Sequence, residues 1–233
     1  MSPPQNFPLA WDSIDWVLLD MDGTLLDLHF DSYFWKQHLP KRYSELHQVE
    51  LDTIRPQIHR QLEDKQGTLD WYCTQYWSKV FNLDIIAAKT ELRHLICERP
   101  QAQEFLSYIG DLGKPRVLVT NADRPGIGLK FSATTLESQL DLVISSHDYG
   151  IPKEQAEFWH KLQRKIPFDP QRTLFIDDSE SVLSAASGFG IKYVYAIGQA
   201  DSTQPRLQSS QFPIIDDFMQ LVDLDHEWGR TNG

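Results

Sequence analysis

Cysteine is scarce in this sequence: Cys73 and Cys97 are the only two among 233 residues. They do not form the closely spaced pair that is typical of zinc sites, and one pair cannot build the dense disulfide framework of a small secreted domain. We therefore expect both thiols to be reduced, as they are in most cytosolic proteins.

Basic residues are also in deficit. The chain has 22 Lys and Arg against 33 Asp and Glu, a net charge of −11. Sequence-independent binding to nucleic-acid polymers or to anionic membranes needs a basic surface, so we expect neither as a partner. A small anionic substrate is still possible, because a metal ion and one or two nearby cations can reverse the local field.

Long apolar runs are missing as well. No stretch approaches the roughly 20 residues that a transmembrane helix needs. Met1 to Pro4 are neither basic nor followed by an apolar segment, so we expect no signal peptide. With 41% hydrophobic residues, the chain is long enough to bury a substantial core. We predict a soluble, cytoplasmic protein.

The stretch from Val17 to Leu26 is the one around which we expect the fold to be organised. Val17 to Leu19 predict a strand buried on both faces, as in a parallel sheet. Asp20 and Asp22 follow it directly, at the position where open α/β sheets bind ligands. Gly23 allows the backbone to approach such a ligand closely.

Two carboxylates so close together are costly unless a cation lies between them, and hard oxygen ligands favour Mg²⁺. The same residues also suit an ordinary turn. A calcium-binding EF-hand loop fits less well, because it follows a helix and has its glycine at the sixth position. Here a strand-like run precedes the aspartates, and Gly23 is the fourth residue counted from Asp20.

The rest of the chain divides into a helical part and an alternating part. Residues 31–98 show no convincing strand, and their periodicity predicts helices around 32–38, 45–65, 69–81 and 84–96. From Pro100 onward we expect strands around 116–121, 140–145, 172–179 and 192–197, and helices around 101–112, 126–136, 153–165, 180–189 and 214–223. This predicts an α/β fold: a Rossmann-like parallel sheet flanked by helices, with an inserted helical cap. The core would comprise residues 1–28 and 99–233, and the cap 29–98.

Three further groups of polar residues follow the predicted strands. Thr120 and Asn121 end the second strand, Lys153 follows the third after a short loop, and Asp177 and Asp178 end the fourth. Singly, each has an ordinary explanation as a strand exit, a solvated lysine or a helix cap. Because parallel strands end at one edge of a sheet, we expect all of them to lie beside the first two aspartates.

Together these residues suit the hydrolysis of a phosphate ester. Asp20 would attack phosphorus and form an aspartyl-phosphate. Asp22 would protonate the leaving oxygen and later deprotonate the hydrolytic water. Thr120, the backbone N–H of Asn121 and the Lys153 ammonium would bind the phosphoryl oxygens.

The same motifs resemble those of a known group of enzymes, the haloacid dehalogenase (HAD) superfamily. They are Asp20-Met21-Asp22-Gly23-Thr24, Thr120-Asn121, Pro152-Lys153 and Ile176-Asp177-Asp178-Ser179. The resemblance spans nearly the whole chain and implies a Rossmann-like core with a mobile cap of the C1 type. It also implies Mg²⁺ held by Asp20, the backbone carbonyl of Asp22 and directly by Asp178, with Asp177 in support.

Within this superfamily the chain looks similar to the bacterial GMP/IMP 5′-nucleotidases. The similar stretches are 18–28, 33–35, 71–73, 76–78, 173–179 and 189–191. This resemblance implies a purine nucleoside monophosphate as substrate. Aromatic rings in the cap would suit it, since base stacking contributes about 1–3 kcal/mol, although such rings also build helical cores. Our candidates for contact with the substrate are Trp35, Trp71, Tyr72 and Trp77.

Other functions remain open to the same motifs. An alternative is a HAD phosphatase or phosphomutase that acts on a phosphosugar or another small phosphorylated metabolite. Dehalogenation is disfavoured by Asp22, because halide leaves without a proton. A non-enzymatic regulator would be expected to have lost the nucleophile or a metal ligand. Cap closure would need hinges, which we expect near residues 24–31 and 97–101.

Overall fold

The computed structural model describes residues 9–223, and its centre is a six-stranded parallel sheet. The strand order is β3-β2-β1-β4-β5-β6, and every neighbouring pair is parallel. The strands are β1 (Trp16–Leu19), β2 (Arg116–Thr120), β3 (Leu142–Ser145), β4 (Thr173–Asp177), β5 (Tyr193–Ile197) and β6 (Ile214–Ile215). Parallel neighbours need crossover connections, which place helices on the faces of the sheet.

Strand β1 lies in the middle of the sheet, paired with β2 on one side and β4 on the other. Val17 and Leu19 pack into the hydrophobic cluster on one face, whereas Leu18 packs into the cluster on the other. All three side chains are fully buried. The prediction of a strand buried on both faces is confirmed.

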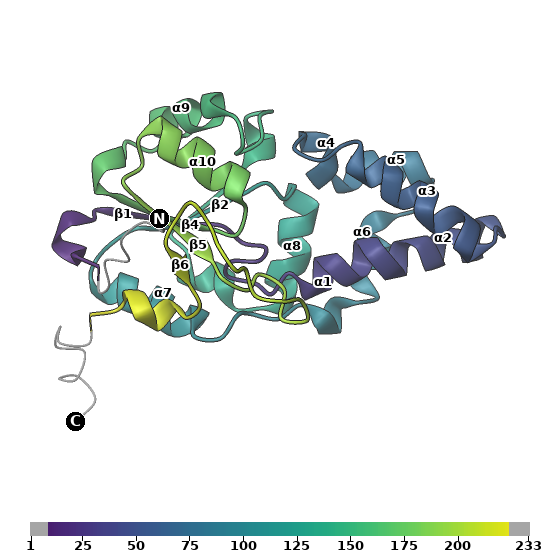
Figure 1. The fold of residues 1–233 in the computed structure, drawn as a ribbon, viewed down its shortest axis with the longest axis horizontal. Helices are drawn as coiled ribbons and strands as arrows, with labels where there is room; N and C mark the ends of the chain where they lie inside the picture. The colour runs from purple at the N-terminus through teal and green to yellow at the C-terminus, as the bar shows by residue number, and fades with distance from the viewer. Residues whose placement is uncertain (1–8, 224–233) are drawn as a thin grey trace.

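Helices cover both faces of the sheet (Figure 1). On one face, α9 (Ala156–Lys165) and α10 (Glu180–Phe189) contribute buried side chains such as Trp159 to the cluster around Leu18. On the other face, α7 (Ala102–Asp111) and α8 (Arg124–Ala133) join the cluster that contains Val17 and Leu19. The predicted α/β fold with a flanked parallel sheet is therefore confirmed.

Between β1 and α7 the chain forms a helical insert, seen at the right of Figure 1. Its α-helices are α1 (His29–Tyr33), α2 (Leu39–His47), α3 (Leu51–Glu63), α4 (Leu69–Tyr72), α5 (Thr74–Phe81) and α6 (Ile85–Thr90). A π-helical segment, Phe34–His38, joins α1 to α2. The two ends of the insert lie side by side, because Leu26 bridges Glu98 and the Arg99 N–H donates to the Leu25 carbonyl at 2.9 Å.

Several predicted helices are divided in the structure. The prediction 45–65 corresponds to the end of α2 and to α3, which are separated at Gln48, a residue in the left-handed region (φ 54°). The prediction 69–81 is broken at Cys73, whose extended backbone ends α4 and whose side chain then caps α5. Helix α8 begins earlier than predicted because the Asp123 carboxylate caps it at Gly126.

The prediction of a helix over 214–223 is wrong. Ile214 and Ile215 instead extend the sheet beside β5, and a 3₁₀ helix follows at Phe218–Leu221. Two adjacent apolar residues fit either a helix or a short strand, so the choice depends on the sheet edge that β5 offers. Within residues 9–223, no helix combines the length and the apolar character needed to cross a membrane.

Candidate active site

The residues predicted from the strand ends meet at one edge of the sheet, where they line a cavity of about 640 Å³. Asp20, Asp22, Thr120, Asn121, Lys153, Asp177 and Asp178 all belong to its lining. The helical insert supplies the opposite wall. Parallel strands thus bring together residues up to about 160 positions apart in the chain, as the sequence predicts.

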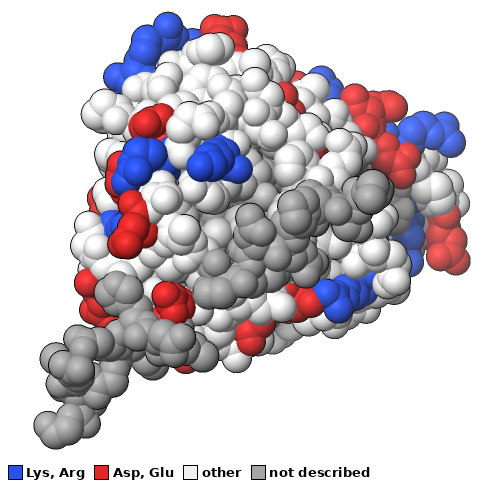
Figure 2. Space-filling view, turned by 60° about the vertical axis from the view of Figure 1, so that its left-hand side comes forward, with Lys and Arg blue, Asp and Glu red and all other residues white. Residues whose placement is uncertain are grey.

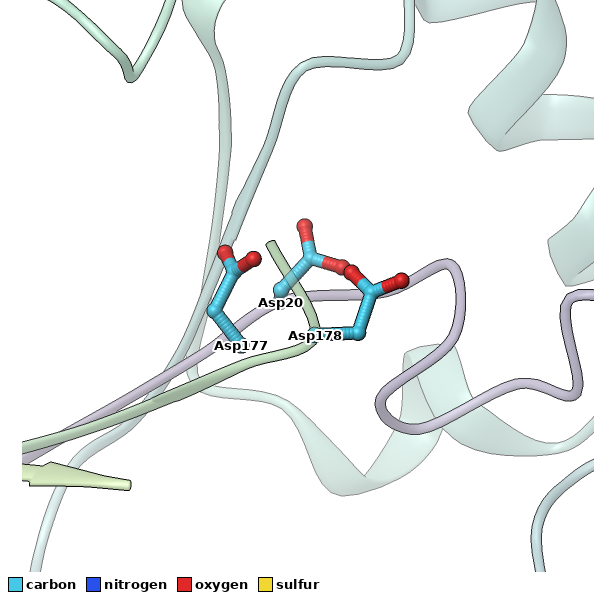
Figure 3. Close-up of side chains that lie close together, drawn as sticks. All are labelled: Asp20, Asp177 and Asp178. Carbon is cyan, nitrogen blue, oxygen red and sulfur yellow. The ribbon is translucent and has the colours of Figure 1, made fainter. Parts of the chain in front are cut away.

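Three carboxylates form a tight cluster at the base of this cavity. One oxygen from each of Asp20, Asp177 and Asp178 lies within 4.8 Å of the other two (Figure 3). Burial raises the pKa of Asp20 to about 6, and burial together with the carboxylates of Asp177 and Asp20 raises that of Asp178 well above its ordinary value. Crowded, desolvated oxygen ligands of this kind fit a hard divalent cation.

Lys153 is the cation beside this cluster. Its buried Nζ donates to Asp20 Oδ1, to Asp177 Oδ2 at 2.7 Å and to the Val119 carbonyl at 2.9 Å. Burial alone would lower the pKa of Lys153, but the carboxylates of Asp177 and Asp20 raise it above its ordinary value. An ammonium group has three hydrogens, and here all three are donated to protein oxygens, so Lys153 orients the two carboxylates.

The neighbouring acids Asp177 and Asp178 have different surroundings. Asp177 accepts from Lys153 through Oδ2 and from the Ser179 N–H through Oδ1 at 2.8 Å. Asp178 lies against Gly23, where an added Cβ would come within 2.5 Å of Asp178 Oδ2. Gly23 also has a positive φ of 85°, so this position requires glycine for both space and backbone conformation.

Asp22 does not join the carboxylate cluster; its side chain points to a lysine instead. Lys130 Nζ lies 2.5 Å from Asp22 Oδ1 and 2.8 Å from Asp31 Oδ2, and Lys89 Nζ lies 2.6 Å from Asp31 Oδ1. Burial raises the pKa of Asp22 to about 6, against the opposing effect of Lys130. The cavity therefore holds a second charge cluster, formed by the buried Lys89 and Lys130 and by the partly buried Asp22 and Asp31.

Sequence reasoning missed the other three members of this second cluster. Lys130 lies within α8 between Leu129 and Phe131, and a lysine among apolar residues is a weak signal of a buried, paired ammonium. Asp31 and Lys89 come from different helices of the insert, and no spacing in the sequence relates them to each other.

Thr120 and Asn121 are both buried at the end of β2. Thr120 Oγ1 accepts from the Ala122 N–H at 3.0 Å. The Asn121 side chain is used at both ends: Oδ1 accepts from the Lys153 N–H at 2.9 Å, and Nδ2 donates to Glu154 Oε2 at 2.9 Å. A phosphate contact by Asn121 would therefore have to come from its backbone, as predicted.

Of the four aromatic candidates in the insert, Trp35, Trp71 and Tyr72 line the cavity. Trp77 does not line it. Its side chain is 1% exposed, stacks on Phe81 at a centroid distance of 5.3 Å and donates from Nε1 to the Trp71 carbonyl at 3.0 Å. The structure thus contradicts direct contact of Trp77 with a substrate, because the ring is enclosed in the core of the insert.

Residues 14–190 match the family model of haloacid dehalogenase-like hydrolases. The chain belongs to the haloacid dehalogenase-like hydrolase family. It is 40% identical over 214 residues to the GMP/IMP nucleotidase YrfG of Escherichia coli K12, which covers 92% of this chain and 96% of that protein. The prediction of a HAD enzyme close to the bacterial GMP/IMP nucleotidases is thereby confirmed.

More distant matches agree with this family. The HAD protein is 26% identical to the phosphoglycolate phosphatase of E. coli K12 over 133 residues. This alignment covers 54% of this chain and 52% of the relative. The fold of the HAD protein resembles the crystal structure of a HAD phosphatase from Thermococcus onnurineus, with a TM-score of 0.72, 20% identity and coverage of 86% of this chain and 93% of that chain. The predicted enzyme class, a phosphoric monoester hydrolase of the HAD type, is therefore supported by sequence and fold alike.

The net charge was the basis for expecting neither nucleic-acid polymers nor anionic membranes as partners. On the face of the HAD protein seen in Figure 2, the basic side chains of the described residues lie among acidic ones rather than in one continuous patch. The exclusion of nucleic-acid polymers and membranes stays a prediction from the net charge of −11.

Proposed function

We propose that this protein is a Mg²⁺-dependent phosphomonoesterase that hydrolyses the purine nucleoside 5′-monophosphates GMP and IMP through an aspartyl-phosphate intermediate. The observation that carries the proposal is one cavity lined both by the Asp20 carboxylate and by the aromatic side chains of Trp35 and Trp71. The 40% identity to a GMP/IMP nucleotidase over 92% of the chain supports the purine substrate.

Asp20 suits the role of nucleophile, because the Lys153 ammonium group orients its carboxylate at the base of the cavity. Attack of an Asp20 oxygen on phosphorus forms the acyl phosphate and breaks the bond to the 5′ oxygen of the nucleoside. Asp22 gives that oxygen its proton. In the second step Asp22 takes a proton from water, which attacks phosphorus, releases phosphate and restores Asp20.

Two groups at the end of β2 suit the phosphoryl oxygens. Thr120 Oγ1 accepts a hydrogen bond from the Ala122 N–H, so its own O–H can donate to the substrate. The backbone N–H of Asn121 is the second proposed donor. Donors held at fixed positions stabilise the charge that develops on phosphoryl oxygens, with no reorganisation during the reaction.

Mg²⁺ would be held by the Asp20 and Asp178 carboxylates and by the Asp22 backbone carbonyl. The fit rests on the cluster itself, in which oxygens of Asp20, Asp177 and Asp178 lie within 4.8 Å of one another. When bound, the ion would neutralise negative charge on the transferring phosphoryl group. Asp177 would support the site by holding Lys153, with which it shares a 2.7 Å hydrogen bond.

We further propose that residues 29–98 act as a cap on a core of residues 1–28 and 99–233, with hinges near 24–31 and 97–101. The paired chain segments at Leu26 and Glu98 support this boundary. In the cap, Trp35, Trp71 and Tyr72 are the candidates for contact with the nucleoside. We also propose that the partner is a small phosphorylated metabolite and that the protein acts in the cytoplasm.

Phosphate release from a panel of substrates tests this function. Purified protein is incubated with GMP, IMP, AMP, CMP and several sugar phosphates, with and without Mg²⁺. We expect the highest kcat/KM for GMP and IMP, and loss of activity when EDTA removes the metal. Faster turnover of sugar phosphates than of any nucleotide would instead favour the phosphosugar alternative, and full activity in EDTA would contradict the metal requirement.

A further inference from the structure

One turn of the insert is docked on two acidic side chains of the core. The Tyr72 hydroxyl donates to Glu154 Oε1 at 2.7 Å. Two residues later, the Thr74 N–H and hydroxyl both donate to Asp123 Oδ2, at 2.7 and 2.6 Å. Asp123 follows the phosphate-binding segment at the end of β2, and Glu154 follows Lys153 directly. The insert thus contacts the core next to the groups that would hold the phosphate.

Glu154 carries this contact further into the site. Its second oxygen, Oε2, accepts from Asn121 Nδ2 at 2.9 Å, and Asn121 Oδ1 accepts from the Lys153 N–H at 2.9 Å. Three hydrogen bonds therefore run in sequence from Tyr72 in the insert to the backbone of Lys153. The side chain of that lysine in turn donates to Asp20.

The chemistry of this connection depends on a carboxylate at position 154. A carboxylate accepts hydrogen bonds on both oxygens, so it can satisfy Tyr72 and Asn121 together. A glutamine there accepts on one oxygen only and would turn its own NH₂ group toward Tyr72 or Asn121. If Asn121 flipped to accommodate it, the amide would present Nδ2 to the Lys153 N–H. With the NH₂ group toward Tyr72, the phenol must switch from donor to acceptor; in every other arrangement one of the three bonds is lost, and in none is the acceptor charged.

We propose that Glu154 is a positioning residue that couples contact of the cap to the orientation of Asn121 and Lys153. The proposal rests on the proposed phosphatase function. Burial and the neighbouring Glu154 carboxylate raise the pKa of Tyr72 above its ordinary value. The phenol therefore stays neutral and donates its hydrogen to Glu154. When the cap contact is lost, Glu154 keeps only Asn121 as donor. The glutamate can then rotate, so Asn121 donates to an acceptor that is no longer held in place.

A double-mutant cycle tests the coupling. Tyr72→Phe removes the donor from the cap, and Glu154→Gln disturbs the acceptor in the core. We expect each variant to lower kcat about tenfold, the effect of losing a hydrogen bond to a charged group, with less than a twofold change in KM. Because both changes break the same connection, the double variant should be no slower than the slower single variant.

Glu157→Gln is the matched control, since Glu157 lies three residues further along, in the first turn of α9, has a 64% exposed side chain and undergoes the same loss of charge. It should leave kcat unchanged. Additive losses in the double variant, a Glu154→Gln effect equal to that of the control, or a change in KM alone would overturn the proposal. Kinetics are measured on the substrate that the wild type hydrolyses fastest, whichever it is. The coupling is therefore tested even if the enzyme does not prefer purine nucleotides.

A measurement without turnover keeps the proposal testable if Glu154→Gln does not fold or if the wild type has no activity. The side-chain amide of Asn121 and the backbone amide of Lys153 are followed by ¹⁵N nuclear magnetic resonance in the wild type and in Tyr72→Phe. Both resonances should shift, and that of Lys153 is the diagnostic one, because Tyr72 interacts with the Asn121 side chain, whereas the Lys153 N–H donates to Asn121 Oδ1. Unchanged resonances would overturn the coupling.

Discussion

At the scale of the residue, Asp20 and Asp22 are two carboxylates with different partners. Asp20 lies in the carboxylate cluster beside Lys153, whereas Asp22 pairs with Lys130. Burial raises the pKa of each to about 6, so the two carboxylates differ in their partners and not in their affinity for a proton. The roles of the two aspartates remain predictions, and each can be tested by a single substitution.

Asp20→Asn should abolish turnover without unfolding the protein. The amide has nearly the same shape but is not a nucleophile, so kcat should fall by about 10³-fold or more, as when other enzymes lose their nucleophile. Steady-state phosphate release gives kcat, and circular dichroism melting checks the fold. Wild-type rates in a purified, folded variant would contradict the assignment of Asp20 as the nucleophile.

Lys130→Met should reduce stability strongly. The lysine is 3% exposed and lies between Asp22 and Asp31, so its loss leaves two partly buried carboxylates with less compensation, at a cost of about 3 kcal/mol. Urea denaturation measures the free energy of unfolding. Lys161→Met is the control: its 3.6 Å pair with the exposed Glu157 should contribute about 0.3–0.5 kcal/mol, and its 3.3 Å hydrogen bond to the Tyr149 carbonyl about 1 kcal/mol. Equal losses in the two variants would show that the buried cluster does not stabilise the fold.

The contrast between these clusters shows what a sequence can predict about a site. Asp20, Asp177 and Lys153 could be predicted because each follows an apolar strand, and parallel strands end at one edge. Lys130, Asp31 and Lys89 could not, because they lie on helices whose packing brings them together only in the folded chain. The carboxyl ends of parallel strands can be located from the sequence, whereas the contacts between helices of the core and the insert cannot.

At the scale of the element, the insert separates aromatic side chains that face the cavity from those that hold the helices together. Trp71 lines the cavity, whereas Trp77 is enclosed and donates to the Trp71 carbonyl. Both residues fit the same aromatic pattern in the sequence, so periodicity alone could not assign the face of each ring. The break at Cys73 changes the direction of the helix between them.

Two alanine variants test this separation. Trp71→Ala should raise KM for GMP about fivefold to 100-fold, the equivalent of one lost stacking contact, with little loss of stability. Trp77→Ala should instead cost about 3–5 kcal/mol of unfolding free energy, because it leaves a cavity in the core of the insert. Kinetics and urea denaturation are measured on both. A large KM effect confined to Trp77→Ala would reverse the assignment.

Short elements were less predictable than long ones. The central strand β1 and its parallel neighbours follow from continuous apolar runs, and the structure confirms them. The pair Ile214 and Ile215 was assigned to a helix, but it forms a sixth strand because the edge of β5 accepts it. Two residues are too few to show whether the hydrophobic period is that of a helix or of a strand. The neighbouring strand therefore decides their conformation.

At the scale of the whole molecule, the sheet and the insert enclose one cavity that combines the charged groups with the aromatic wall. In our proposal the sheet edge carries out the phosphate chemistry, and the insert selects the leaving group. This arrangement predicts that metal binding stabilises the core, because Lys153 pairs with Asp20 and Asp177 only, and a second cation would offset the repulsion between these carboxylates and Asp178.

Mg²⁺ at about 100 times its dissociation constant should raise the melting temperature by about 5–10 °C. Asp178→Asn should remove this effect, because the variant loses a proposed direct ligand, whereas Asp64→Asn on the exposed surface of the insert should retain it. Differential scanning fluorimetry with and without the metal measures both. A Mg²⁺-dependent increase that survives in Asp178→Asn would show that the ion binds elsewhere.

The central claim is that GMP transfers its phosphoryl group to Asp20. Excess enzyme is mixed with GMP and Mg²⁺, quenched in acid within the first turnover, digested and examined by mass spectrometry. The account predicts a phosphate adduct on Asp20, in the peptide that contains β1, and none in the Asp20→Asn variant. Release of phosphate from GMP in the first turnover without this adduct, or with an adduct on another residue, would contradict it.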